Sequence, residues 1–195
     1  MQTKKVDIKE KIKESAKDIF FSVAYKDASM RDVAAKSGMT VGNIYRYYEN
    51  KEVLFDDILA DTYSSVIKLI KVTDIAKIFI KKRTVSDENA IIKTSKFRMF
   101  ILDTIIKIVA NHSTELYILI ANSEGSKYEN TKQKIAELIK STITKRLADV
   151  TEDRADTYAY LIITTFSYLL KKYKSNEENL KQEIKYFFEK LFQTF

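Results

Sequence analysis

The sequence predicts an all-α fold made of a short N-terminal module and a larger C-terminal domain. The 195 residues include no proline and three glycines, while Lys, Glu, Ile and Leu are abundant, and this composition favours helix almost throughout. Apolar residues recur at helical spacing, and capping residues divide the chain into helices without proline. The length suits one module of roughly 50 residues plus a larger domain, each able to bury a core. We expect the division to fall between residues 1–50 and 51–195.

The first helix is predicted from an apolar stripe near the N-terminus. The members of the stripe repeat at spacings that place them on one helix face: Ile8, Ile12, Ala16, Ile19, Phe20 and Val23. We expect this stripe to cover the two short helices that follow.

Two short helices joined by a tight turn are predicted next. Ser29 is placed as an N-cap, and Asp32 can reach back to it in a capping box. The first short helix starts near Met30 and ends at Gly38, which adopts the left-handed conformation at low cost. Thr40 then caps a second helix over residues 41–48.

Gly42 lies on the first turn of this second helix, where it should cost about 1 kcal/mol relative to alanine. Two of the three glycines of the chain fall within residues 29–51, and the turn explains only Gly38. A missing side chain at Gly42 would let the backbone N–H groups approach a phosphate or a base edge. The alternative is close packing against a neighbouring helix.

Polar side chains that can donate hydrogen bonds gather on the same short helix. DNA-binding helices use hydroxyl, amide and guanidinium groups on phosphates and bases. The side chains in question are Thr40, Asn43, Tyr45, Arg46 and Tyr47. Their concentration after a glycine turn indicates a three-helix N-terminal domain with a helix-turn-helix that reads double-stranded DNA.

The segment GMTVGNIYRYYENKEVL resembles the signature of the TetR family of ligand-responsive transcriptional regulators. The matching elements are Gly38, Thr40, Gly42, Tyr45, Tyr48 and the pair Lys51-Glu52, with Asp32, Val33 and Ala34 upstream. Two positions depart from the family pattern. Ala24 stands where a glycine usually precedes an aromatic residue, and Tyr48 stands where phenylalanine is commoner.

By this resemblance, one set of residues touches DNA phosphates and another faces the major groove. The phosphate set is Thr40, Tyr45, Tyr47 and Lys51. The groove set is Val41, Gly42, Asn43 and Arg46. Ser29 and Arg31, at the start of the first short helix, complete the expected DNA-binding residues.

A fourth helix is predicted to begin at its cap Asn50 and to continue toward Lys71, long enough to enter the second domain. In a ligand-responsive regulator, a small rotation of such a connecting helix changes the separation of two recognition helices. The further helices are expected over residues 74–82, 86–111, 113–123, 129–149, 152–173 and 177–195, with a turn at Gly125 and caps at Ser86, Thr151 and Ser175.

The last helix carries an apolar stripe that must be covered, since four of the eleven phenylalanines fall in its final nine residues. A core within the chain is one possible cover. The family resemblance implies the other, a homodimer held by a four-helix interface of the last two helices. The expected interface residues are Leu161, Leu169, Ile184, Phe187, Phe188, Leu191 and Phe192.

The resemblance also implies an effector pocket among the middle helices. The candidate lining residues are Phe97, Phe100, Ile101, Thr104, Tyr117, Ile120 and Tyr160. This set is apolar and aromatic, so we expect a largely apolar small-molecule effector, the alternative being an ordinary core. The residues that could orient polar groups of a ligand are Arg98, Asp103, His112 and Glu124.

Composition argues against several other functions. The chain has no cysteine and one histidine, so it offers no thiol chemistry, no His/Cys metal site and no nucleophilic triad. Glycine-rich phosphate loops and catalytic motifs are absent from the sequence, and we expect neither an enzyme nor a cofactor. The first residues alternate in charge and lack an apolar secretory core, and no apolar run reaches the ~20 residues that a membrane requires. We therefore expect a cytoplasmic protein with no membrane partner. The net charge of +7 is spread along the chain and only permits DNA binding.

These observations together favour a dimeric transcriptional regulator, a repressor that a small molecule releases from a palindromic operator. The alternative is a non-specific DNA-binding architectural protein without a small-molecule ligand. A helical enzyme that has inherited the N-terminal module is a third class, which nothing in the chain favours.

Overall fold

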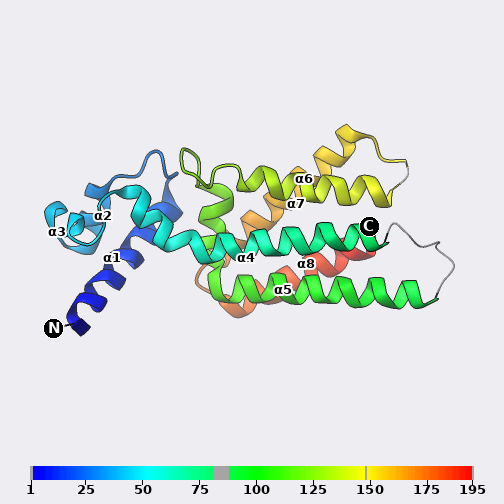
Figure 1. The fold of residues 1–195 in the computed structure, drawn as a ribbon, viewed down its shortest axis with the longest axis horizontal. Coiled ribbons are helices and arrows are strands. Elements are labelled where there is room, and N and C mark those ends of the chain that lie inside the picture. Colours follow the sequence, from blue (N-terminus) through cyan, green and yellow to red (C-terminus); the bar gives the residue numbers. More distant parts are fainter. Residues whose placement is uncertain (1, 81–87, 148, 195) are drawn as a thin grey trace. The chain divides into compact units, whose positions relative to one another are not determined.

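The computed structural model describes residues 2–80, 88–147 and 149–194, with side chains for 6–74, 95–145, 147 and 149–191. Within these ranges the regular structure is helical and contains no strand, which confirms the predicted all-α fold (Figure 1). The helices are α1 (Gln2–Ser22), α2 (Met30–Ser37), α3 (Val41–Tyr45), α4 (Lys51–Ile80), α5 (Glu88–Ala121), α6 (Thr131–Arg146), α7 (Glu152–Lys172) and α8 (Glu177–Thr194). Among the described residues, no helix is long and apolar enough to cross a membrane.

The helices form two compact units. The first unit consists of the chain up to Tyr63 together with Thr114–Thr131, and the second consists of Ser64–Ser113 together with the chain from Lys132 onward. Helices α4 and α5 therefore each contribute residues to both units. The expected division into residues 1–50 and 51–195 concerns function and stays a prediction, because these geometric units do not test it.

The core of the first unit gathers around α1. Ile12, Ala16 and Phe20 are completely buried, as the apolar stripe predicts. Val23, by contrast, is 41% exposed, because α1 ends at Ser22 and the chain leaves the helical path. The other core residues of this unit include Val33 and Ala34 of α2, Ile44 of α3, and Leu54, Phe55 and Leu59 of α4.

In the second unit, α4 from Ser64 onward runs antiparallel to the part of α5 that precedes His112 (Figure 1). A separate cluster joins α6, α7 and α8. Its buried members are Ile143, Ala155 and Ile162, against which Ile139, Leu147, Val150, Phe187 and Leu191 pack.

Two predicted helix boundaries in this region have different outcomes. The expected break near Asp74 is wrong, because α4 continues to Ile80 and the Thr73 hydroxyl donates to the carbonyl of Leu69 within the helix, 2.7 Å away. The expected break after Asn111 is confirmed as a kink in α5, where His112 has φ −145° and ψ 34°. The expected cap at Ser86 lies outside the described residues.

Candidate DNA-binding site and effector cavity

The start of α2 is held by the predicted capping box. The Asp32 amide donates to the Ser29 hydroxyl oxygen at 3.2 Å, and the Asp32 carboxylate accepts from the Ser29 amide at 2.9 Å and from the Ser29 hydroxyl at 2.6 Å. The hydrogen bonds from the Ser29 side chain and then its backbone lower the pKa of Asp32. The Ser29 hydroxyl is therefore engaged in the cap, and its contact with DNA stays a prediction.

The turn between α2 and α3 is the one that the sequence predicts. Gly38 has φ +68°, and its amide donates to Ala35 while the amide of Met39 donates to Ala34. This pair of bonds is a Schellman motif, which needs a left-handed residue at the position of the glycine. Thr40 then caps α3 by accepting from the Asn43 amide at 3.2 Å.

Helix α3 ends at Tyr45, which corrects the expected range of 41–48. The amides of Tyr47 and Tyr48 both donate to the carbonyl of Ile44, so the chain tightens into a turn instead of continuing as a helix. The side chains of Ile44 and Tyr48 are buried at either end of this turn and fix α3 on the unit.

The remaining side chains of α2 and α3 leave a surface of hydrogen-bond donors. Tyr45 is 50% exposed, and Arg31, Thr40, Gly42 and Arg46 are also exposed. In the described part of the chain, the guanidinium groups of Arg31 and Arg46 have no ion pair and no hydrogen bond. Gly42, Tyr45 and Arg46 are exposed and lie at helical spacing on one side of α3. The other predicted DNA-binding residues of this segment, Val41, Asn43 and Tyr47, are half-buried.

Gly42 has open space on its side-chain side. A Cβ built there would meet no heavy atom within 4 Å outside the immediate helix backbone. Close packing against a neighbouring helix, the alternative explanation of this glycine, is therefore wrong. The side of α3 at Gly42 is free to be approached by a partner.

Tyr48, one of the two departures from the family pattern, has a defined role. Its hydroxyl donates to the Asp57 carboxylate at 2.7 Å, and the Lys9 ammonium lies 3.0 Å from the same oxygen. Burial and then the Asp57 bond raise the pKa of Tyr48 above its ordinary value. Burial raises the pKa of Asp57 as well, but the hydrogen bonds from Tyr48 and Lys9 outweigh this effect and leave the pKa of that carboxyl below its ordinary value. The phenol thus links the turn after α3 to α4 and α1.

Lys51 lies at the start of α4, where its ammonium donates to the carbonyl oxygens of Tyr25 and Ala28 at 2.6 and 2.8 Å. The same ammonium lies 4.2 Å from the centre of the Tyr25 ring. Burial lowers the pKa of Lys51, and the Asp27 carboxylate partly opposes this shift. Lys51 holds the loop between α1 and α2, and its phosphate contact stays a prediction.

Asn122 is a positioning residue that sequence reasoning missed. Its side-chain amide donates to the backbone carbonyls of Phe20 and Phe21 at 2.8 and 2.9 Å. Its backbone carbonyl accepts from the Tyr25 amide at 2.8 Å. These bonds satisfy the end of α1 where the family usually has a glycine and this chain has Ala24. No local sequence signal could reveal these contacts, because Phe20 and Phe21 lie 102 and 101 positions from Asn122 in the sequence.

Two further contacts fasten the segment 114–131 to the rest of the first unit. Glu115 of α5 lies 3.2 Å from the ammonium of Lys17 on α1. The Tyr128 hydroxyl donates to the Asp56 carboxylate of α4, which also pairs with Lys127. We call Asn122, Glu115 and Tyr128 the clasp, because together they tie this segment to α1 and α4.

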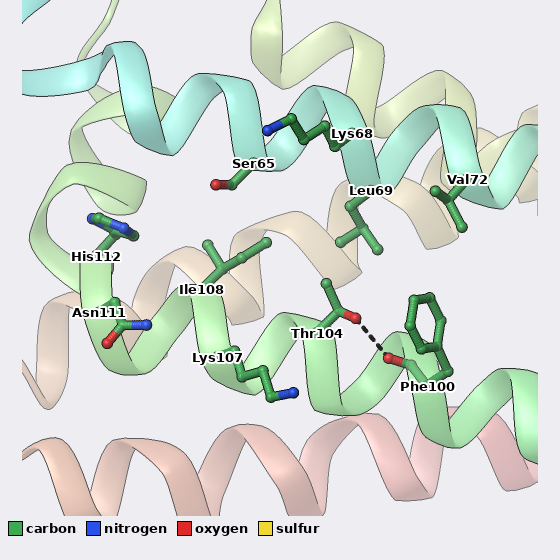
Figure 2. A pocket seen from close by; sticks show the side chains of 10 residues that line it. All are labelled: Ser65, Lys68, Leu69, Val72, Phe100, Thr104, Lys107, Ile108, Asn111 and His112. Carbon is green, nitrogen blue, oxygen red and sulfur yellow. Dashed lines mark hydrogen bonds between the residues drawn. The ribbon is translucent and has the colours of Figure 1, made fainter.

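The second unit contains a cavity of about 340 Å³ between α4 and α5 (Figure 2). Its lining residues are Ser65, Lys68, Leu69, Val72, Phe100, Thr104, Lys107, Ile108, Asn111 and His112. Phe100 and Thr104 are the two predicted ligand-binding residues among them, and His112 was expected to orient a polar ligand.

The other predicted ligand-binding residues lie elsewhere. Phe97 and Ile101 are half-buried on α5 outside this lining, and Tyr160 is 63% exposed on α7. Tyr117 and Ile120 are buried in the first unit. A ligand contact of these five residues stays a prediction.

The predicted dimer residues have mixed surroundings. Leu169 and Ile184 are buried by their own chain, and Phe187 and Leu191 pack on the cluster of the second unit. Leu161 is 52% exposed. Phe188, half-buried, contacts the ring of Phe166, and the side chain of Phe192 lies outside the described residues.

Comparison with known proteins finds a match in the helix-turn-helix part of the chain. Residues 12–58 match the family profile of bacterial regulatory proteins, tetR family. A curated relative, an uncharacterized HTH-type transcriptional regulator of Bacillus subtilis (strain 168) called YdgC, is 29% identical over 69 residues. That match spans 35% of this chain and 35% of the relative, so about a third of either protein is compared.

The solved structures to which the chain is similar include a transcriptional regulator (TerR/AcrR family) from Aquifex aeolicus VF5. It is 19% identical, with 96% of this chain and 99% of that chain covered and a TM-score of 0.49. NalD of Pseudomonas aeruginosa, described as the secondary repressor of the MexAB-OprM multidrug efflux pump, is 18% identical, with 93% and 95% covered and a TM-score of 0.47. Residues 12–58 therefore match the tetR family of bacterial regulatory proteins, and within them α2 and α3 fold as a helix-turn-helix.

Proposed function

We propose that this chain is a DNA-binding transcriptional repressor that binds a palindromic operator as a dimer and leaves it when a small molecule binds. The observation that carries the proposal is the surface around Gly42. The guanidinium groups of Arg31 and Arg46 have no ion pair or hydrogen bond with the described residues, Tyr45 is half-exposed, and a Cβ at Gly42 would meet no heavy atom within 4 Å outside the adjacent helix backbone. Guanidinium and phenol groups of this kind are suited to phosphates and base edges.

A dimer would give this surface its specificity. Two recognition helices must reach successive major grooves, in the simplest case ~34 Å apart. Helix α7 offers a face for a second copy, because Leu161 and Tyr168 are 52% and 58% exposed and lie, with exposed Thr164 between them, at helical spacing. Large apolar side chains at that spacing favour a helix of the partner as their cover.

Release by a small molecule requires a path from the cavity to the recognition surface. Helix α5 continues from Asn111 and His112, which line the cavity, to Glu115 of the clasp, and Glu115 forms an ion pair with Lys17 of α1. A ligand need only bind the DNA-incompetent conformation better than the competent one, and each tenfold difference supplies about 1.4 kcal/mol of coupling.

The test is selection of bound DNA from a random pool, followed by titration of the selected site at two salt concentrations. We expect a palindromic site and an affinity that falls steeply with salt, since phosphate contacts release counterions. A folded dimer that enriches no sequence would instead indicate a non-specific architectural protein and overturn the proposal.

A further inference from the structure

We propose that the cavity between α4 and α5 binds an amphipathic anion, a carboxylate with a medium-length hydrocarbon tail, with its acid group toward His112 and its tail toward Phe100. This inference rests on the proposed function, in which the cavity is the effector site. It replaces the expectation of a largely apolar effector with a defined chemical class.

The charge of the lining favours an anion. Lys68 of α4 and Lys107 of α5, both exposed, are the charged residues of the lining, and among the ten described lining residues none carries a carboxylate. A cationic ligand would therefore meet only like charge or neutral groups. An anion would gain a charge-assisted hydrogen bond, which is stronger than a neutral one.

Polar and apolar residues separate along the length of the cavity, as Figure 2 shows. One end is polar and is lined by Ser65, Lys68, Asn111 and His112. The opposite end is lined by Leu69, Val72, Phe100 and Thr104. The Thr104 hydroxyl is turned back onto its own helix, where it donates to the carbonyl of Phe100 at 2.8 Å, so that end is apolar in character.

Ile108 extends the apolar surface toward the polar end and is 8% exposed. A ligand that satisfies both ends must itself be polar at one end only. The volume of about 340 Å³ lies at the small end of the range for small-molecule sites, which suits a single unbranched chain better than a multi-ring compound.

The polar end coincides with the kink of α5. Asn111 and His112 line the cavity, and His112 has the non-helical φ of −145° that separates the two parts of the helix. Glu115 of the clasp follows three residues later. An acid group bound at the kink would act where α5 changes direction, and a neutral chain of the same length would lack that contact.

The experiment uses the full chain without DNA and measures binding by isothermal titration calorimetry. The probes are decanoate, decanol and decyltrimethylammonium, which share one hydrocarbon tail and differ in head-group charge. We expect decanoate to bind with one site per protomer, decanol to bind about tenfold more weakly, and decyltrimethylammonium to bind more weakly still. Equal affinity for decanoate and decanol, or stronger binding of the cation, would overturn the proposal.

Two substitutions test the orientation of the ligand. Lys68→Gln should weaken decanoate binding about tenfold and leave decanol unchanged. The matched control Lys71→Gln removes an exposed lysine of the same helix that does not line the cavity, and it should change neither affinity. Phe100→Ala should weaken decanoate more than hexanoate, because the shorter tail extends less far toward Phe100 from an acid group at the polar end. An equal loss for both acids would contradict the proposed orientation.

The failure of this inference is distinguishable from failure of the proposed function. If the selected operator binds but decanoate does not, the chain is a regulator with a different ligand and the present inference is wrong. If decanoate binds as expected but no operator is selected, the ligand class stands and the regulatory function fails. If both bind, decanoate should reduce operator affinity, and Lys68→Gln should reduce that response.

Discussion

Replacement of Gly42 by alanine separates the stability of α3 from its use as a recognition surface. The added methyl group meets no heavy atom within 4 Å beyond the adjacent helix backbone, and the backbone at Gly42 has no positive φ. Glycine in a helix is less stable than alanine by roughly 0.5–1 kcal/mol, so Gly42→Ala should stabilise the folded protein by about that amount. The structure offers no clash that would cancel the gain.

Operator binding should change in the opposite direction. If the DNA backbone or a base edge approaches α3 at Gly42, the methyl group prevents the closest approach and lengthens the neighbouring charge-assisted bonds. We expect a loss of at least about tenfold in operator affinity, which corresponds to about 1.4 kcal/mol. Fluorescence anisotropy with the selected operator measures the affinity, and thermal unfolding followed by circular dichroism measures the stability.

The matched control is Ala35→Gly, the reverse change at an exposed position of α2. It should destabilise the protein by a similar amount and leave operator affinity nearly unchanged. A Gly42→Ala protein that is more stable and binds the operator as well as the wild type would refute the assignment of Gly42 to the DNA surface.

The other predictions concern the contacts around this surface and the dimer. Tyr48→Phe should lower the free energy of unfolding by about 1 kcal/mol, measured by urea titration, because Asp57 loses a hydrogen-bond donor. Since the pKa of Asp57 is below its ordinary value, the stabilising contribution of its carboxylate is present at neutral pH and is lost as the pH falls through that lowered pKa. A Tyr48→Phe protein whose free energy of unfolding equals that of the wild type at both neutral and acid pH would contradict the link. Tyr45→Ala should weaken operator binding without lowering the melting temperature. Lys51→Ala should lower both the operator affinity and the melting temperature, because the Lys51 ammonium donates to two loop carbonyls. An unchanged melting temperature for Lys51→Ala would count against its structural role. Leu161→Asp should convert the dimer to a monomer in sedimentation velocity and weaken operator binding, and a dimer that persists would move the interface elsewhere.

The local design of the helix-turn-helix could be predicted from the sequence because each of its signals acts over a few residues. Ser29 and Asp32 form the capping box at a separation of three positions, Gly38 takes the left-handed turn, and Thr40 caps α3. Such hydrogen bonds depend on the identity and spacing of neighbouring residues and on little else. Where tertiary contacts intervened, local reasoning failed, as with the end of α3, where Tyr48 is drawn into the core.

The sequence by itself determined the all-helical class, the capped turn and the family segment at residues 12–58. Only the tertiary structure decided that Asn122 completes α1, that Asp57 holds Tyr48, and that the lining of the cavity separates into a polar and an apolar end. The physical reason is sequence separation. Helix periodicity and caps act within a turn or two of the chain, whereas the bond from Asn122 to Phe20 joins residues 102 positions apart. Partners at that distance are selected by the packing of whole helices, which no local pattern specifies.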